Sequence, residues 1–469
     1  MPVTRKRLAL LIVFTGACST QPGYERPPVE LPAAWKESAP RFAADGRWWR
    51  IYEDTSLDSV IEESMKSNAD LVIAAARVDE ARAVLGETRS GLFPQVDAQG
   101  AASRQRSSRE TATSFAGVPR EFSNYRATVN VSYELDLFGR LSRAQQAAAL
   151  DAQSREALLQ STRLLVQAEA AQTYLSLRAL DTERALVRDT VAAYADTLRL
   201  TQRRHQAGDV AELDVVRVQS ELAGNEAEAL SLDRQRAQLE NALSVLVGEN
   251  ASSFSLAPAD WSTALPVVPP GVPGTVLARR PDVAAAQSSL LAAQARVGVA
   301  QAAWFPSVAL TADGGFASPE LGDLFKWSAR AWSVGALLSL PIFDGGRRES
   351  AVQSAQAQLD AQLALYRGQV LNAFREVEDQ LAALRLLDEQ SLAQGRAVDS
   401  ARRASAISET RYRNGLVSQL ELLDARRSEL RNRRQALQVR SAQYQATVAL
   451  IRAIGGSWDV DGERKLATR

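Results

Sequence analysis

Apolar residues recur at helical spacing over four long stretches of this chain. The stretches are 140–207, 209–247, 347–414 and 416–454. The two tracts that contain them, 120–257 and 342–469, include no proline, and Ala, Gln, Arg, Leu and Glu fill them. That mixture favours long helices. At about 1.5 Å per residue, the two longer stretches predict helices of roughly 100 Å, far longer than an ordinary domain helix.

The apolar surface of these predicted helices is broad and rich in alanine. In the first stretch it spreads over more than one side of the helix and includes Leu158, Leu159, Leu164, Leu165, Val166, Ala168, Ala171 and Leu175. Because an amphipathic helix is held mainly by the face that it buries, helices of this length need neighbours. Small alanines allow close approach on two sides, which favours the wall of a tube over a two-stranded coiled coil.

Four shorter segments alternate between apolar and polar residues, as strands do. We expect these strands at about 93–105, 125–138, 306–316 and 332–343. In the second segment, one face carries Val129, Val131, Tyr133 and Leu135, and the residues between them are polar. In the fourth segment, one face carries Trp332, Val334, Ala336, Leu338 and Leu340.

Strands with one apolar and one polar face suit a transmembrane β-barrel, which has lipid outside and water inside. An ordinary sheet packed on a hydrophobic core is the more common source of such alternation. Four strands cannot close a membrane barrel alone, because each unsatisfied edge group in lipid costs several kcal/mol. The membrane interpretation therefore requires an oligomer, and three copies would supply twelve strands.

The second half of the chain repeats the first. Phe93 and Pro94 correspond to Phe305 and Pro306, and "HQAGDVAELD" corresponds to "YRNGLVSQLE", which aligns Gly208 with Gly415. The paired helical stretches also match in length, since 140–207 and 347–414 each contain 68 residues, while 209–247 and 416–454 each contain 39. These matches indicate an internal duplication.

The repeats divide the chain into expected domains. Repeat 1 covers 57–250 and repeat 2 covers 281–455, each with a leading helix, two strands and two long helices. The leading helix of repeat 1 is expected to run from Leu57 to Arg89. An extended segment rich in Pro and Trp at 18–56 precedes the repeats, a Pro-rich linker at 251–280 separates them, and a tail at 456–469 follows.

Residues 1–17 have the pattern of an export signal. Three basic residues precede an apolar run from Leu8 to Phe14, and small residues then lead to Cys18. This pattern resembles a bacterial lipoprotein signal, in which cleavage exposes the cysteine for acylation, and Ser19 after it implies the outer membrane. The alternative is a plain secretory signal with an incidental cysteine. No other stretch reaches the ~20 apolar residues of a membrane-spanning helix.

The composition argues against most catalytic chemistry and against nucleic-acid binding. Lys plus Arg and Asp plus Glu both number 55, so no overall basic field attracts nucleic acid. His205 is the only histidine and Cys18 the only cysteine, so one chain cannot form a His-based triad, a zinc finger or an internal disulfide. A Gly-rich phosphate loop is also absent. We therefore expect no enzymatic activity and no metal or other cofactor.

Several motifs, in order along nearly the whole chain, are similar to those of the TolC family of outer-membrane efflux proteins, in its OprM-like lipoprotein branch. They include "GYERPPVELPAAW" after Cys18, "LARRPDVAAAQSSLLAAQARVGVAQAAWFPSVAL" between the repeats, "PIFDGGRR" and "YRNGLVSQLELLDARRSEL". The resemblance implies a mainly α homotrimer with a long periplasmic helical barrel and a twelve-stranded outer-membrane β-barrel, four strands per protomer. It also implies a periplasmic adapter protein, an inner-membrane RND-type pump and small-molecule cargo such as drugs.

The resemblance also assigns roles to the ends of the long helices. Gly208 and Gly415 can reverse the chain after a helix, so the two turns should form the periplasmic tip. In the family, this tip docks the adapter and closes the channel. The adapter contacts near the first turn would be Val210, Leu213 and Asp214. His205 lies beside this turn and is expected to be a solvated surface residue.

The gate positions that the resemblance carries over are Leu420, Asp424 and Arg427. Their spacing places all three on one face of a helix. Around a threefold axis, Leu420 could form an apolar plug, Asp424 and Arg427 an ionic latch, and charges at the constriction would select ions by sign. Spacing alone leaves open that Asp424 and Arg427 are an exposed surface pair of ~0.3 to 0.5 kcal/mol.

Two other functions remain open at this point. A type I secretion duct, which passes proteins or peptides, would have the same sequence features. A lipid-anchored coiled-coil scaffold without a pore belongs to a different class, and it predicts helices without strands and no conductance.

Overall fold

The computed structural model describes residues 47–108, 121–261, 263–268, 274 and 279–456. The predicted export signal, the acylation site Cys18 and the residues after 456 lie outside the described residues. The chain divides into two compact units. Among the described residues, the first unit contains 78–155 and 286–366, and the second contains 47–77, 156–285 and 367–456.

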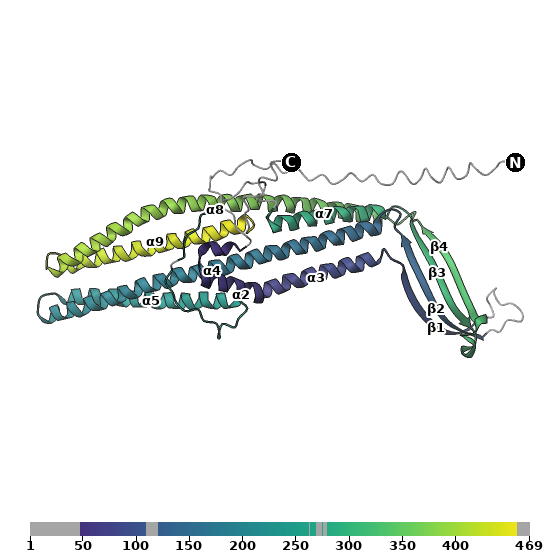
Figure 1. The fold of residues 1–469 in the computed structure, drawn as a ribbon, viewed down its shortest axis with the longest axis horizontal. Coiled ribbons are helices and arrows are strands. Elements are labelled where there is room, and N and C mark those ends of the chain that lie inside the picture. Colours follow the sequence, from purple (N-terminus) through teal and green to yellow (C-terminus); the bar gives the residue numbers. More distant parts are fainter. Residues whose placement is uncertain (1–46, 109–120, 262, 269–273, 275–278, 457–469) are drawn as a thin grey trace. The chain divides into compact units, whose positions relative to one another are not determined.

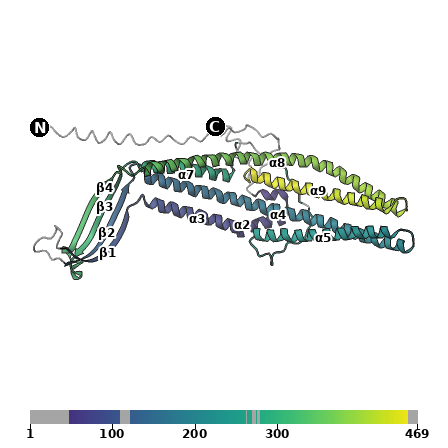
Figure 2. The same ribbon diagram turned by 180° about the vertical axis from the view of Figure 1, so that it is seen from behind.

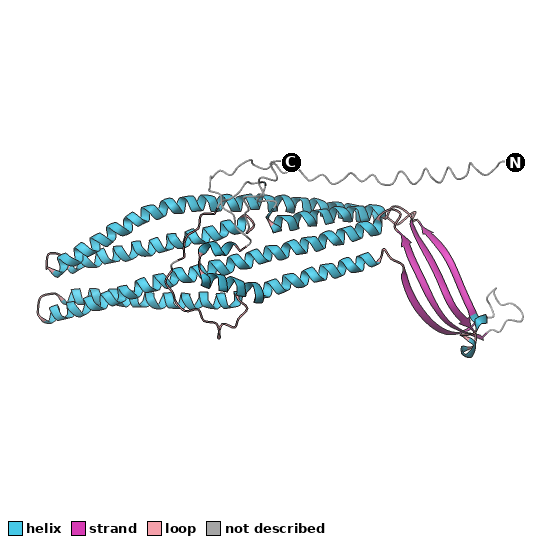
Figure 3. Cartoon of the chain, in the orientation of Figure 1, coloured by secondary structure: helices cyan, strands magenta, loops and turns pink. Residues whose placement is uncertain are grey.

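The first unit contains a four-stranded antiparallel sheet, drawn in magenta in Figure 3. Its strands pair in the order β1 (Gln95–Arg106), β2 (Glu121–Leu135), β3 (Ser307–Ser318) and β4 (Arg330–Ser339). Two short 3-10 turns, η2 (Leu321–Asp323) and η3 (Trp327–Ala329), lie between β3 and β4. Each repeat therefore supplies one strand hairpin, and β2 joins the two hairpins by pairing with β3.

The strand register aligns like residues across the whole sheet. One row consists of Asp97, Asn130, Asp313 and Ser333. The adjacent row consists of Val96, Val131, Ala312 and Val334. Because directly paired residues point to the same side, one face of the sheet is polar and the other apolar. The apolar face is bare within one chain, since Trp332 is 78% exposed and Val334 is 75% exposed.

Local chemistry explains where two strands end. β2 stops at Leu135 rather than near residue 138, because Asp136 caps the next helix. The Asp136 carboxylate accepts hydrogen bonds from the backbone N–H groups of Leu141 (3.0 Å) and Ser142 (2.8 Å). β4 stops at Ser339 rather than near residue 343, because Pro341 has no N–H to donate to the ladder.

The helices of the first unit pack closely at one glycine. Helix α7 (Pro281–Ala302) contains Gly298, whose carbonyl oxygen accepts a hydrogen bond of 3.0 Å from Arg143 Nη1 on α4 (Arg140–Gln206). A Cβ atom at Gly298 would lie 2.7 Å from Arg143 Cδ. Ser154 and Ser289 share a hydrogen bond of 2.9 Å between the same two helices.

The second unit contains the greater part of two helical hairpins, whose longer helices begin in the first unit. In repeat 1, α4 has 67 residues and α5 (Glu212–Leu246) has 35; in repeat 2, α8 (Arg347–Arg413) has 67 and α9 (Gln419–Ala453) has 35. Both hairpins turn at the same end of this unit, as Figures 1 and 2 show from opposite sides. In the described part of the chain, no helix is long and apolar enough to cross a membrane.

An aromatic core packs residues 48–52 and Trp261 against these hairpins. The 3-10 turn η1 (Trp48–Tyr52) buries Trp48 and Tyr52 completely. The Tyr444 ring of α9 lies 6.1 Å from the Tyr52 ring and 4.7 Å from the ring of Trp261 in the linker, measured between centroids. Tyr52 and Trp261 are therefore both packed against α9 of repeat 2.

The leading helix of repeat 1 is broken, so the expectation of one continuous helix was wrong. It forms α2 (Thr55–Ser67) and α3 (Ala69–Ser90), separated by Asn68 in an extended conformation. Asn68 Oδ1 accepts hydrogen bonds from the backbone N–H groups of Asp70 (2.9 Å) and Leu71 (3.4 Å), and its Nδ2 donates to Leu246 O (3.1 Å). The side chain thus caps α3 and ties it to the end of α5.

Candidate functional site at the hairpin ends

The two hairpin turns have the same backbone geometry. Gly208 has φ +82° and Gly415 has φ +71°, a left-handed conformation that favours glycine. The N–H of Gly208 donates to His205 O, and the N–H of the next residue donates to Arg204 O. Around Gly415 the equivalent bonds reach Tyr412 O and Arg411 O. This is the glycine-terminated helix end known as the Schellman motif, present once in each repeat.

The return helices begin differently in the two repeats. In α9, the Ser418 side chain accepts a hydrogen bond from the backbone N–H of Glu421, whereas Ala211 at the start of α5 has no side-chain oxygen to offer. His205 is exposed, and its Nδ1 lies 3.0 Å from Val210 O across the first turn. The turn of repeat 2 therefore has the better capped return helix.

Leu420, Asp424 and Arg427 lie together on an exposed face of α9. Leu420 is 45% exposed, although it is a large apolar side chain close to the helix end. Arg427 Nη1 donates to Asp424 Oδ1 at 3.2 Å, one turn away on the same helix. The three predicted gate residues are thus brought together as one apolar and two charged side chains on the tip.

Arg427 also binds the other hairpin, through a residue that sequence reasoning missed. Its Nη2 donates to Glu221 Oε1 on α5, and this bond, together with the charge of Glu221, raises the pKa of Arg427 above its ordinary value. Burial and the Glu221 carboxylate raise the pKa of Tyr194 on α4. No spacing rule connects Glu221 to Arg427, because they are 206 positions apart in different repeats.

Further contacts join the two hairpins near the turns. Gln419 Nε2 donates to Thr201 Oγ1 at 3.0 Å, and Arg426 Nη1 donates to Thr197 Oγ1 at 2.6 Å. A small apolar cluster of Tyr194, Val218 and Leu423 is buried between them. The tip of α9 is therefore held against α4 and α5 by a few separate contacts rather than by a broad core.

The sequence profile described as "Outer membrane efflux protein" matches residues 60–249 and 272–456. The chain belongs to this family. The two matched blocks fall on the two repeats, which supports their common origin. As a member of the family, the chain is an outer-membrane channel for efflux.

Individual relatives agree with this assignment over nearly their full lengths. The chain is 34% identical to TtgC of Pseudomonas putida, named a probable efflux pump outer membrane protein, over 96% of this chain and 95% of the relative. It superposes with a TM-score of 0.82 on the open state of the MtrE outer membrane channel of Neisseria gonorrhoeae, at 27% identity, covering 92% of this chain and 97% of MtrE. CmeC of Campylobacter jejuni shares the fold with a TM-score of 0.90, at 24% identity over 96% and 98% of the two chains.

The remaining predicted tip residues of this efflux protein lie on repeat 1. Leu213 is 57% exposed and occupies the position that aligns with Leu420, so the duplication places a leucine on the tip of each return helix. Asp214 forms a long ion pair of 3.7 Å with Arg217, and Val210 is half-buried beside the turn. These side chains lie on the first hairpin, at its turn and at the start of α5.

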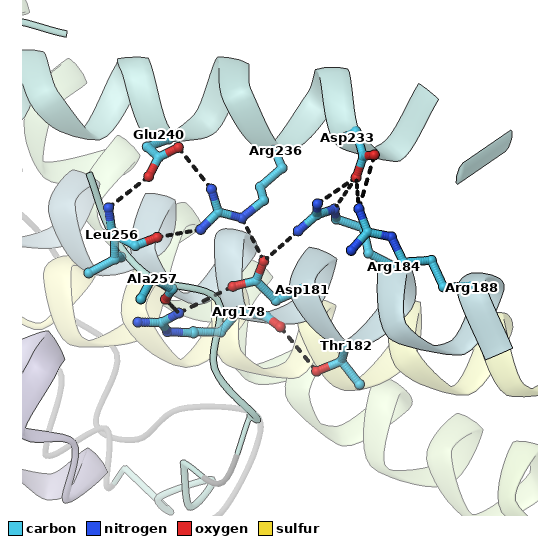
Figure 4. A network of polar contacts seen from close by, with 10 residues as sticks. All are labelled: Arg178, Asp181, Thr182, Arg184, Arg188, Asp233, Arg236, Glu240, Leu256 and Ala257. Carbon is cyan, nitrogen blue, oxygen red and sulfur yellow. Dashed lines mark hydrogen bonds and ion pairs between the residues drawn. The ribbon is translucent and has the colours of Figure 1, made fainter. Parts of the chain in front are cut away.

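A second polar cluster, away from the tips, was not predicted. Figure 4 shows Asp181 of α4 between Arg178 at 3.2 Å, Arg184 at 3.2 Å and Arg236 of α5 at 2.8 Å. Asp233 binds Arg184 and Arg188, so the cluster continues along both helices (Figure 4). All of these charges are paired, which is how buried charges are tolerated.

This cluster fixes the start of the linker. Arg178 Nη1 donates to Ala257 O at 2.8 Å, and Leu256 N donates to Glu240 Oε1 at 2.7 Å (Figure 4). Its role is therefore to attach the linker to the first hairpin. Across the residues that the structure describes, no group of three or more His, Cys, Asp or Glu side chains is arranged to hold a metal ion.

Proposed function

We propose that three copies of this chain form a gated exit duct, which conducts drugs or other small molecules passively from the periplasm to the exterior. The strands β1 and β4 each have one edge without a partner among the described residues, and such edges need pairing in a membrane. Three sheets joined at these edges would form a closed barrel of twelve strands. The bare apolar face, with Trp332 and Val334, would then contact lipid.

The gate of this duct is the exposed face of α9 with Leu420, Asp424 and Arg427. Around a threefold axis, three copies of Leu420 would narrow the opening, and the charged pairs would form a ring. The single observation that supports this role best is the 45% exposure of Leu420 beside an ion pair that is itself bound to Glu221 on the other hairpin. A large apolar side chain that is exposed close to the end of a helix indicates a surface that contacts a partner.

The partners of the duct follow from its place in an efflux pump. We propose that a periplasmic adapter protein docks on the tip at Gly208, Val210, Leu213, Asp214 and Gly415, and that an RND-type pump in the inner membrane delivers the cargo. The exposed Leu213 supports an interaction surface there. We further propose that acyl chains on Cys18 anchor the chain in the outer membrane. Because TtgC is named as part of an efflux pump, we favour efflux over type I secretion as the function of this chain.

Single-channel conductance in planar bilayers tests the proposed gate. The variant is the pair Asp424→Ala with Arg427→Ala, and the matched control is Arg375→Ala with Asp379→Ala, an exposed ion pair of 2.9 Å on α8. The wild type should conduct weakly, because the latch is closed. We expect conductance to rise several-fold in the gate variant and to stay unchanged in the control.

Two results would overturn parts of this proposal. Equal conductance in the wild type and the gate variant would remove Asp424 and Arg427 from the gate and leave the duct intact. A folded, membrane-inserted protein that conducts nothing in any form would exclude the duct and favour a scaffold without a pore.

A further inference from the structure

A second ion contact joins the hairpins seven residues beyond the gate residue Arg427. Arg434 of α9 donates from Nε to Glu183 Oε1 on α4 and from Nη2 to Glu228 Oε1 on α5, both at 2.6 Å. Glu228 lies seven residues beyond Glu221, the partner of Arg427. Because seven residues return a helix to nearly the same face, α9 and α5 carry two ion pairs in the same register, one behind the other.

These two ion pairs differ in strength. The Arg427 side chain is 46% exposed and reaches one carboxylate of the other hairpin. The Arg434 side chain is 30% exposed and reaches two, one on each helix of that hairpin, and Glu183 is only 14% exposed. Charge-assisted bonds from one guanidinium fork to two acceptors are strong and directional. Solvent also screens the contact between Arg434 and Glu183 less than the contact between Arg427 and Glu221 at the tip.

The packing of α9 changes at the same place. Leu430 packs against the buried cluster of Leu180, Val187 and Leu232 from α4 and α5. Beyond Arg434, α9 enters the main core, where Val448 and Ile451 are completely buried. Between Leu430 and the turn at Gly415, α9 contacts the first hairpin through the few separate contacts described for the tip. Arg434 is therefore the strongest attachment of α9 to the first hairpin before the gate.

We propose that Arg434 is a positioning residue for the gate, which fixes the point on α9 from which the tip segment moves when the duct opens. This inference rests on the proposed duct. Leu420 lies 14 residues before Arg434, which is about 20 Å along a helix, so a tilt of roughly 15° at Arg434 moves Leu420 by about 5 Å. Once the tip contact of Arg427 is broken, loss of Arg434 would move the pivot toward the core and enlarge the opening.

The conductance test uses Arg427→Gln as the background, because an intact tip contact would mask the effect. Arg434→Gln alone should change conductance less than twofold. The double variant should exceed Arg427→Gln by at least threefold, and Arg427→Gln with Arg434→Lys should return toward the single variant. The matched control is Arg433→Gln in the same background, since Arg433 pairs only with Glu429 of its own helix at 3.6 Å among the contacts described.

A distance measurement separates positioning from general destabilisation. Single spin labels at Ser428 and Gln438, which are both exposed on α9 and lie before and after Arg434 in the sequence, report distances between the copies in the trimer. In Arg427→Gln, we expect the Ser428 distances to lengthen and the Gln438 distances to stay constant. In the double variant, both should lengthen. A merely destabilised protein would instead lose the defined distances at both positions.

The outcomes distinguish this inference from the duct itself. If Arg427→Gln conducts more than the wild type and Arg434→Gln adds nothing, Arg434 does not position the gate, and the duct stands. Lengthened Gln438 distances in Arg427→Gln alone would place the pivot beyond Arg434 and overturn the inference. If no variant conducts, the duct itself is excluded.

Discussion

At the scale of single residues, the sequence placed the gate side chains on one face but not their partners. The spacing of Leu420, Asp424 and Arg427 was enough to predict a shared helical face, and the structure has them there. Glu221 and Glu228 could not be predicted, because their contacts join different repeats and depend on how two hairpins pack. The role of the three residues as a gate remains a proposal.

Asp282 at the start of α7 should make the stability of this protein sensitive to acid. Burial raises the pKa of its carboxyl, but hydrogen bonds and charge from Arg280, with a bond from Gln369, outweigh burial and leave the pKa below the ordinary 3.8. A carboxyl whose pKa is lower in the folded protein than in the unfolded protein stabilises the folded state fully at pH values above its unfolded pKa. This stabilisation is lost as the pH falls through the folded pKa. Stability should therefore fall below about pH 4.

The variant Asp282→Asn tests this contribution. At pH 7 it should lower the free energy of unfolding by about 1 to 3 kcal/mol, because Arg280 loses a charged acceptor and keeps Glu376. Between pH 4 and pH 2 it should lose less additional stability than the wild type. Parallel denaturation curves at these pH values measure both effects, and equal acid sensitivity of the two proteins would contradict the account.

At the scale of elements, the pattern of apolar residues predicted the long helices closely and their interruptions poorly. The expected ranges 140–207 and 347–414 compare with Arg140–Gln206 and Arg347–Arg413 in the structure. The break at Asn68 was missed, because helical spacing continues on both sides of it. Asn68 caps α3 locally, and its bond to Leu246 O, far along the chain, also favours the break. The two strand ends were displaced by local effects, because Asp136 caps the helix that follows β2 and Pro341 follows β4.

The glycine turns give a prediction for the hairpins. Gly208→Ala and Gly415→Ala should each lower the free energy of unfolding by about 1 kcal/mol, because an L residue is strained at positive φ. Gly368→Ala is the matched control, since Gly368 lies within α8 and a Cβ there meets nothing within 4 Å. It should stabilise by about 0.5 to 1 kcal/mol.

Thermal unfolding followed by circular dichroism measures these effects. The unfolding temperature should fall for the two turn variants and rise for the control. Equal shifts in all three proteins would show that the positive φ values do not constrain the turns.

At the scale of the whole molecule, a single chain exposes a large apolar surface, and two strand edges have no partner among the residues that the structure describes. The sheet exposes Trp332 and Val334, and β1 and β4 end it without further strands among the described residues. The tip exposes Leu213 and Leu420 at matching positions of the two repeats. The number of strands predicts an oligomer if the sheet lies in a membrane, because four strands cannot close a barrel there.

The subunit count of the detergent-extracted protein tests the proposed duct most directly, because a closed barrel and a threefold gate both require more than one copy. Native mass spectrometry of the mature, membrane-extracted protein measures this count. We predict particles that contain three chains and keep this composition on dilution. A folded particle of one chain, stable in the same detergent, would contradict the account.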